Sequence, residues 1–196
     1  MNEQIQSELK KIYNSRYSIS ESTRATYSRG EDTYDPILSQ AVVFPETNEE
    51  VSKTLLLCNH HKVPVVPFGT GTSLEGNVVG NEEGITISLE KMNKILSVNV
   101  EDFDCRVQAC VTKEQLNEYL REDGVFFPID PGANAAIGGM ASTSASGTMA
   151  VKYGTMKTVI TGLTVVLPNG EIVRTGGRTK KTSAGYNLTN LFVGSE

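Results

Sequence analysis

Short hydrophobic runs bounded by proline, glycine or polar residues recur along the chain and predict a series of strands. Residues 41–44 form the first run, which stops at Pro45, and residues 63–67 form the second. A helical segment between them gives the strand–helix–strand order that is typical of a parallel βαβ unit. Further strands are expected at 84–89, 95–100 and 105–111, and a hairpin at 163–173 around the turn Pro168-Asn169-Gly170.

Two capping boxes predict where helices begin. Thr47–Glu50 opens a helix that ends near Lys62 and Pro64. Its apolar stripe carries Val51, Leu55 and Cys58. Thr112–Gln115 opens a second helix, which Gly124 is placed to end. The inner face of this second helix carries Leu116, Tyr119 and Leu120.

The polar start of the chain differs from the rest. We expect residues 1–38 to form one or two short helices and an irregular arm on the main body. The main body, residues 39–196, is expected to form two lobes, one over about 39–100 and the other over about 101–196.

Composition and charge argue against several classes of function. The 196 residues carry a net charge of −5, which gives no general attraction to nucleic acid or to anionic membranes. There is no secretory signal and no apolar run long enough to span a bilayer. We therefore expect a cytoplasmic protein, with a peripheral membrane location as the alternative for a full enzyme. Three cysteines without CxxC spacing and the adjacent His60 and His61 favour reduced structural thiols and a polar helix end over a metal site.

Two segments of small residues call for a different explanation from core packing. Gly69–Ser73 follows the second predicted strand, and Ile137–Gly147 consists almost entirely of glycine, alanine, serine and threonine. Glycine costs about 0.5–1 kcal/mol per residue in a regular element, so it is expected where backbone must approach a ligand closely. Successive N–H groups in a tight turn bind an anion without a lysine, and residues 67–80 contain none. Alone, the first segment is equally compatible with a plain connection; the pair favours one extended ligand, such as a dinucleotide.

Two common nucleotide-binding motifs do not fit these segments. Neither segment is followed by the Gly-Lys-Ser/Thr of a Walker A loop. The G-x-G-x-x-G fingerprint needs a helix directly after it, whereas residues 74–80 show no helical pattern. A nicotinamide-type Rossmann site is therefore not expected.

Eight stretches, at 43–45, 65–76, 127–132, 138–141, 145–147, 153–156, 183–188 and 191–196, together carry a family resemblance. They resemble the FAD-binding domain of the vanillyl-alcohol oxidase / p-cresol methylhydroxylase superfamily, and within it the D-lactate dehydrogenase (cytochrome) and glycolate oxidase branch. The resemblance implies an α+β fold in two lobes. One is a small βαβ lobe and the other a larger, mostly antiparallel sheet flanked by helices, incomplete at the C-terminus and without a substrate domain. Ala109-Cys110 departs from the family, which usually shows Pro-Gly there.

The same resemblance implies an FAD site. The loop at 67–73 would wrap the pyrophosphate, and the later segments would line the rest of the cofactor. The implied cofactor-binding residues are Pro67, Phe68, Gly69, Thr70, Gly71, Thr72, Ser73, Asp130, Pro131, Gly132, Gly138, Gly139, Ala141, Thr143, Ser144, Ala145, Ser146, Gly147, Tyr153, Gly154 and Glu196. Some relatives attach the flavin covalently through a histidine in these loops; this chain has none there, so noncovalent binding is expected. No catalytic residue and no metal ligand is assigned, and Tyr153 and Tyr186 are expected to be packing residues or flavin contacts.

The leading hypothesis is the cofactor portion of an FAD-linked oxidoreductase that oxidises a 2-hydroxy acid, of the D-lactate or glycolate type, through a further domain. A noncatalytic flavin-binding or assembly subunit that needs a partner chain is a second hypothesis. An FAD reductase acting on a nucleotide-sugar enol ether is a third. A homo-oligomer or a partner chain is compatible with all three, and the electron acceptor is left open.

Overall fold

The computed structural model describes residues 3–196, which divide into two compact units. Unit 1 contains the chain up to Met92 and a short return over Val166–Val173, whereas unit 2 contains Asn93–Val165 and Arg174–Glu196. Residues 3–18, which belong to the expected arm, contribute α1 to the core and β1 to the sheet of unit 1.

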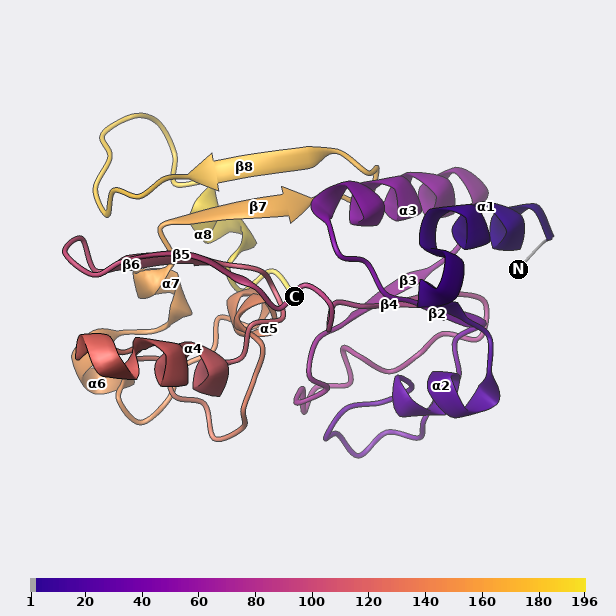
Figure 1. Cartoon of the computed structure of the whole chain (residues 1–196), viewed down its shortest axis with the longest axis horizontal. Coiled ribbons are helices and arrows are strands. Elements are labelled where there is room, and N and C mark those ends of the chain that lie inside the picture. Colours follow the sequence, from indigo (N-terminus) through magenta and orange to yellow (C-terminus); the bar gives the residue numbers. More distant parts are fainter. Residues whose placement is uncertain (1–2) are drawn as a thin grey trace. The chain divides into compact units, whose positions relative to one another are not determined.

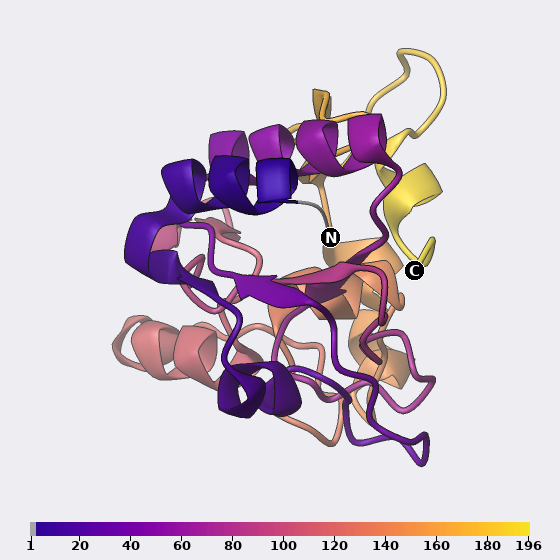
Figure 2. The ribbon, with the colours of Figure 1, turned by 90° about the vertical axis from the view of Figure 1, so that its right-hand side faces the viewer.

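Unit 1 is a four-stranded sheet with helices on both faces (Figures 1 and 2). Its elements are α1 (Glu3–Tyr13), η1 (Asn14–Arg16), β1 (Tyr17–Ser18), α2 (Glu21–Thr26), β2 (Ala41–Val43), α3 (Asn48–His61), β3 (Val65–Phe68) and β4 (Ile85–Ser88). The strand order is β1-β2-β4-β3, with β1 antiparallel and the other three parallel. The predicted βαβ pair is thus parallel, but β4 lies between its two strands, because Ala41 of β2 and Val65 of β3 both pair with Ile85.

Helices α1 and α3 cover one face of this sheet, and α2 lies against the other (Figures 1 and 2). The core on the α1–α3 side includes Leu9 and Tyr13 of α1, Cys58 of α3 and the apolar residues of β2 and β4. The fully buried positions of α3 are Thr54 and Cys58, whereas Val51 and Leu55 are only partly buried, so the predicted stripe is rotated. Thr54 can be buried because its hydroxyl lies 2.6 Å from the Tyr13 hydroxyl. Burial raises the pKa of Tyr13 to about 12.

Unit 2 combines two separate strand pairs with short helices (Figure 1). The elements that lie in it wholly or in part are β5 (Ile95–Asn99), β6 (Asp104–Val107), α4 (Lys113–Leu120), η2 (Arg121–Asp123), α5 (Ile137–Ser142), α6 (Ala150–Tyr153), α7 (Met156–Val159), β7 (Gly162–Val166), β8 (Ile172–Gly176) and α8 (Thr189–Phe192). Strands β5 and β6 pair antiparallel. The predicted strand over 105–111 ends early, at Val107, because the chain turns there and the Val111 N–H donates to Gln108 O at 3.2 Å.

Helix α4 begins as predicted, with Thr112 Oγ1 accepting the Gln115 N–H. Leu116 and Leu120 pack with Val111 against Val98 and Val107 of the β5–β6 pair. The prediction of Tyr119 on the same inner face is wrong, because 59% of its surface is exposed. Gly124 has a φ of 70° and ends the η2 turn that follows the helix.

The predicted hairpin is confirmed as β7 and β8, which run in opposite directions in Figure 1. Leu167 N–H donates to Glu171 O, and Gly170 N–H donates to Leu167 O, each at 2.8 Å. Gly170 has a φ of 87°, which explains the glycine in this turn. Among residues 3–196, none of the helices has the length and apolar character needed to cross a membrane.

Candidate cofactor site

The first small-residue segment lies at the carboxyl end of the parallel strands of unit 1, directly after β3. Ligands of open α/β sheets bind at this edge because the loops that follow the strands meet there. The loop that begins with this segment runs over residues 69–80 and is hydrogen-bonded to residues 28–31: Gly80 N–H donates to Ser28 O at 3.0 Å, and Glu31 N–H donates to Gly71 O at 2.9 Å.

The loop keeps several backbone donors unused. The N–H groups of Gly71, Thr72 and Ser73 have no acceptor within residues 3–196, although all three residues are half-buried. Backbone N–H groups that are withdrawn from solvent are nearly always paired in native proteins, with protein groups or with ordered water. Three consecutive unpaired donors therefore fit an anionic group such as a diphosphate, which would accept from them.

Aromatic rings fix the start of this loop. Phe68 is buried, and its ring meets the edge of Tyr27 with centroids 5.2 Å apart. Tyr27 also meets Phe44 edge to face at 5.4 Å, and its hydroxyl donates to Glu90. A Cβ on Gly71 would lie 2.8 Å from Phe68 Cζ, and Gly71 has a φ of 73°. Both facts favour glycine at position 71.

The second small-residue segment, in unit 2, differs from the expectation because most of its polar groups bond within the chain. It forms the short helix α5, whose first two N–H groups are already used. Ile137 N–H donates to Val111 O at 2.8 Å, and Gly138 N–H donates to Ala109 O at 2.7 Å. The Ser142 and Thr143 hydroxyls donate to the carbonyls of Gly138 and Gly139.

Gly138 is explained by packing alone. A Cβ there would lie 2.8 Å from the Cβ of Ala109, the residue that departs from the family pattern. Gly139 and Gly132, in contrast, have open space around the Cβ position. Of these three glycines, only those two leave room for a ligand.

Asp130 is hydrogen-bonded to the turn that precedes α6 in unit 2. Its carboxylate accepts the Thr148 hydroxyl at 2.7 Å and the Met149 N–H at 3.0 Å. These hydrogen bonds, the Thr148 bond first, lower the pKa of Asp130. Asp130 was predicted as a cofactor contact; the structure gives both of its carboxylate oxygens partners in the chain, and Thr148 is a partner that the sequence did not indicate.

Several other predicted positions of unit 2 lie in or next to α5 and α6 or at the end of the chain. Gly194 N–H donates to Ala141 O and Glu196 N–H to Ser142 O, each at 3.0 Å, so the last residues run beside α5. Tyr153 meets the ring of Phe126 edge to face at 5.6 Å, and Gly154 follows it with a φ of 84°. Tyr186 is 94% exposed, so packing within unit 2 does not account for it.

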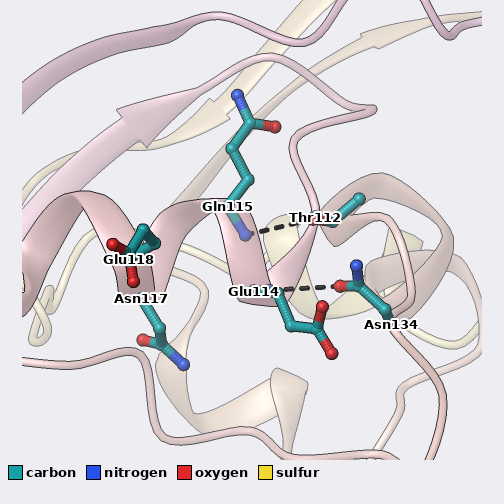
Figure 3. A pocket seen from close by; sticks show the side chains of 6 residues that line it. All are labelled: Thr112, Glu114, Gln115, Asn117, Glu118 and Asn134. Atoms are coloured by element: carbon teal, nitrogen blue, oxygen red, sulfur yellow. Dashed lines mark hydrogen bonds between the residues drawn. The ribbon is translucent and has the colours of Figure 1, made fainter.

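A surface pocket of unit 2 lies along α4 (Figure 3). It is lined by Thr112, Glu114, Gln115, Asn117, Glu118 and Asn134. Asn134 Oδ1 accepts the Glu114 N–H at 3.1 Å, and Thr112 Oγ1 accepts the Gln115 N–H at 3.1 Å. With these donors satisfied and two carboxylates beside them, the pocket does not suit an anion. Residues 3–196 also hold no group of His, Cys, Asp and Glu side chains that could bind a metal ion.

Comparison with known proteins shows which family the chain belongs to. Residues 39–176 match the family described as "FAD binding domain". The chain belongs to this family. Its relatives include the "Probable D-lactate dehydrogenase, mitochondrial" of Danio rerio, 49% identical over 182 residues that cover 91% of this chain and 37% of that protein. The "Glycolate oxidase subunit GlcD" of Bacillus subtilis is 38% identical over 175 residues, covering 88% of this chain and 37% of that protein.

Solved structures with the same fold include p-cresol methylhydroxylase, with a TM-score of 0.80 and 23% identity over 97% of this chain and 40% of that one. An alkyldihydroxyacetonephosphate synthase has a TM-score of 0.86 and 22% identity, covering 100% of this chain and 41% of that one. These likenesses confirm the predicted α+β fold of the p-cresol methylhydroxylase type. The chain spans about a third of the length of the curated relatives named above, 37% of each.

Proposed function

We propose that this chain is the FAD-binding portion of an FAD-dependent oxidoreductase that oxidises a 2-hydroxy acid, of the D-lactate or glycolate type, to the 2-oxo acid. The observation that carries the proposal is the 49% identity with a protein named as a D-lactate dehydrogenase, over 91% of this chain. The loop after β3, with its three unpaired N–H groups, supports the cofactor part of the proposal on physical grounds.

The role proposed for the residues of this chain is to bind the cofactor. The N–H groups of Gly71, Thr72 and Ser73 would hold the diphosphate, and Phe68 fixes the backbone from which they project. When bound, FAD supplies the acceptor for the hydride that leaves the substrate α-carbon. We assign the groups that bind the 2-hydroxy acid and accept its hydroxyl proton to a part of the enzyme that corresponds to the rest of the relatives' length, outside the region that this chain matches.

Noncovalent attachment of FAD is part of the same proposal. The two histidines of the chain are adjacent at the end of α3, and neither lies in the loop after β3 or in the small-residue segment of unit 2. Precipitation of the FAD-loaded protein with acid should release all of the flavin into the supernatant. Yellow colour that stays with the precipitate would contradict this.

A chimera tests the proposed reaction. The part of this chain that aligns with the Danio rerio relative would replace the matching segment of that protein. The chimera would be assayed by dye reduction with D-lactate, L-lactate and glycolate. We expect FAD to bind and one of these acids to be oxidised, with the unmodified relative as the positive control. A folded, FAD-loaded chimera that oxidises none of them, while the relative is active, would overturn the proposed reaction.

A second candidate is a flavin-binding subunit that works only with a partner chain. The Bacillus subtilis relative is named as a subunit, which favours this arrangement over an independent enzyme. Co-purification of the natural protein with a second polypeptide in fixed ratio would support it. The cytoplasmic location expected from composition has no support from the relatives, since the Danio rerio protein is named as mitochondrial.

A further inference from the structure

The segment over residues 28–34, before the matched family region at 39–176, lies directly against the loop after β3 within unit 1. Glu31 N–H donates to Gly71 O at 2.9 Å. A Cβ on Gly30 would lie 2.8 Å from both Gly71 O and Ser73 O. Gly30 is not among the residues with positive φ, so this close approach, rather than backbone conformation, requires the glycine.

These contacts fix the direction of two peptide groups. The described backbone contains no cis peptide bond, and in a trans peptide the N–H points opposite to the C=O. With the Gly71 carbonyl turned toward residues 30 and 31, the Thr72 N–H points away from them. The Ser73 carbonyl likewise turns toward Gly30, which directs the Leu74 N–H the same way. Neither N–H has an acceptor within residues 3–196.

The supporting segment is itself held in place by hydrogen bonds to the Asp32 carboxylate and to the Ser28 carbonyl. Asp32 accepts the Gly30 N–H and the Tyr34 N–H through its two carboxylate oxygens, each at 3.0 Å. The Ser28 carbonyl accepts the Gly80 N–H at 3.0 Å, at the far end of the loop. The segment therefore contacts the loop near its start, at Gly71, and at its end, at Gly80. Because these contacts join backbone atoms, the position of the segment fixes the position of the loop backbone.

We propose that residues 28–34 are a positioning element of the FAD site, which aims the N–H groups of Thr72 and Leu74 at the diphosphate by holding the carbonyls of Gly71 and Ser73. This inference rests on the proposed FAD binding and adds to it a donor, Leu74, and a supporting segment outside the matched family region.

The test compares ligands with and without phosphate. Binding of FAD, ADP and riboflavin to the full chain would be measured by calorimetry for the wild type and for Gly30→Ala. We expect the substitution to lower the affinity for FAD and for ADP about tenfold, a change in binding free energy of about 1.4 kcal/mol. Riboflavin, which lacks the diphosphate, should bind as tightly as before. Gly177→Ala is the matched control, because the space around Gly177 is open.

A second pair of variants keeps the test decisive if Gly30→Ala does not fold. Asp32→Ala removes the acceptor of the Gly30 N–H and should lower the affinity for ADP. Asp32→Asn keeps one acceptor oxygen and should retain part of that affinity. Wild-type ADP affinity in either Gly30→Ala or Asp32→Ala, whichever of them folds, would overturn the positioning role, as would an equal loss of riboflavin binding. A wild-type chain that binds neither FAD nor ADP would instead overturn the proposed cofactor, and this inference with it.

Discussion

The carboxylate of Asp130 occupies the space that a side chain at Gly147 would need, since a Cβ built on Gly147 would collide with Asp130 Oδ1 and with its carbonyl oxygen. The aspartate and the glycine, seventeen positions apart in the sequence, thus form one structural feature. The carboxylate also bonds Thr148 and Met149, so it fixes the turn that leads from α5 to α6.

The stability that Asp130 supplies should depend on pH. Its pKa is lowered in the folded protein, first by the Thr148 hydrogen bond. The contribution is therefore present above the unfolded pKa, about 3.9, and is lost as pH falls through the lower folded value. Asp130→Asn should unfold at lower urea than the wild type at pH 7, and this difference should shrink below about pH 4. A difference that does not change with pH would contradict the assignment.

Substitution of Gly71 by valine should disturb the loop after β3. The added Cβ would press on Phe68 and must adopt a φ of 73°, which a β-branched residue rarely tolerates. We expect FAD affinity to fall at least tenfold, or about 1.4 kcal/mol, in an equilibrium titration of flavin fluorescence. Gly177→Val, in open space, is the control. Unchanged flavin binding in Gly71→Val would show that the loop is only a connection.

The ion pair between Arg16 and Glu50 joins η1 to the first turn of α3. Two hydrogen bonds of 2.7 and 2.5 Å link the guanidinium and the carboxylate, and each side chain is about a fifth exposed, 21% and 20%. Arg16→Met should lower the free energy of unfolding by about 1 kcal/mol, at the upper end for such pairs. Lys11→Met, which breaks the more exposed pair with Glu8, should have a smaller effect. Equal effects of the two substitutions on the urea midpoint would contradict this ranking.

The three cysteines should differ in reactivity. Cys58 is buried, and burial raises the pKa of its thiol to about 11, so almost no thiolate forms at pH 8. Cys105 is exposed, and Cys110 is buried. Native protein treated with iodoacetamide should be labelled first at Cys105, whereas Cys58 and Cys110 should need urea, as mass spectrometry of peptides would show. Rapid labelling of Cys58 in the native protein would contradict its placement in the core.

The chain of 196 residues should not oxidise 2-hydroxy acids by itself, even with FAD supplied. Both of its histidines are at the end of α3, and the relatives whose reaction is proposed here are nearly three times as long as the shared region. A dye-reduction assay on both lactate enantiomers, glycolate and D-2-hydroxyglutarate checks this. Turnover near 1 s⁻¹, the low end of ordinary enzymes, would show that the catalytic groups are already present.

The sequence predicted those features that depend on neighbouring residues. The caps at Thr47 and Thr112 are confirmed because the capping hydroxyl oxygen and the N–H that donates to it lie within one turn of helix. The turn before Gly170 is confirmed for the same reason, since its hydrogen bonds join residues a few positions apart. The family resemblance identified the fold and the cofactor class through stretches spread over the whole main body.

Only the tertiary structure determined which glycines are free to meet a ligand. Gly71 and Gly138 look alike in the sequence, yet Gly71 stands in a loop with unpaired donors, while Gly138 is packed against Ala109 and bonded to it. The sequence likewise did not predict the place of β4 between β2 and β3 or the approach of Gly30 to Gly71. The physical reason is the same in each case. Strand order, close packing and the pairing of a backbone N–H all depend on contacts between residues that are far apart in the sequence, and sequence spacing does not give those distances.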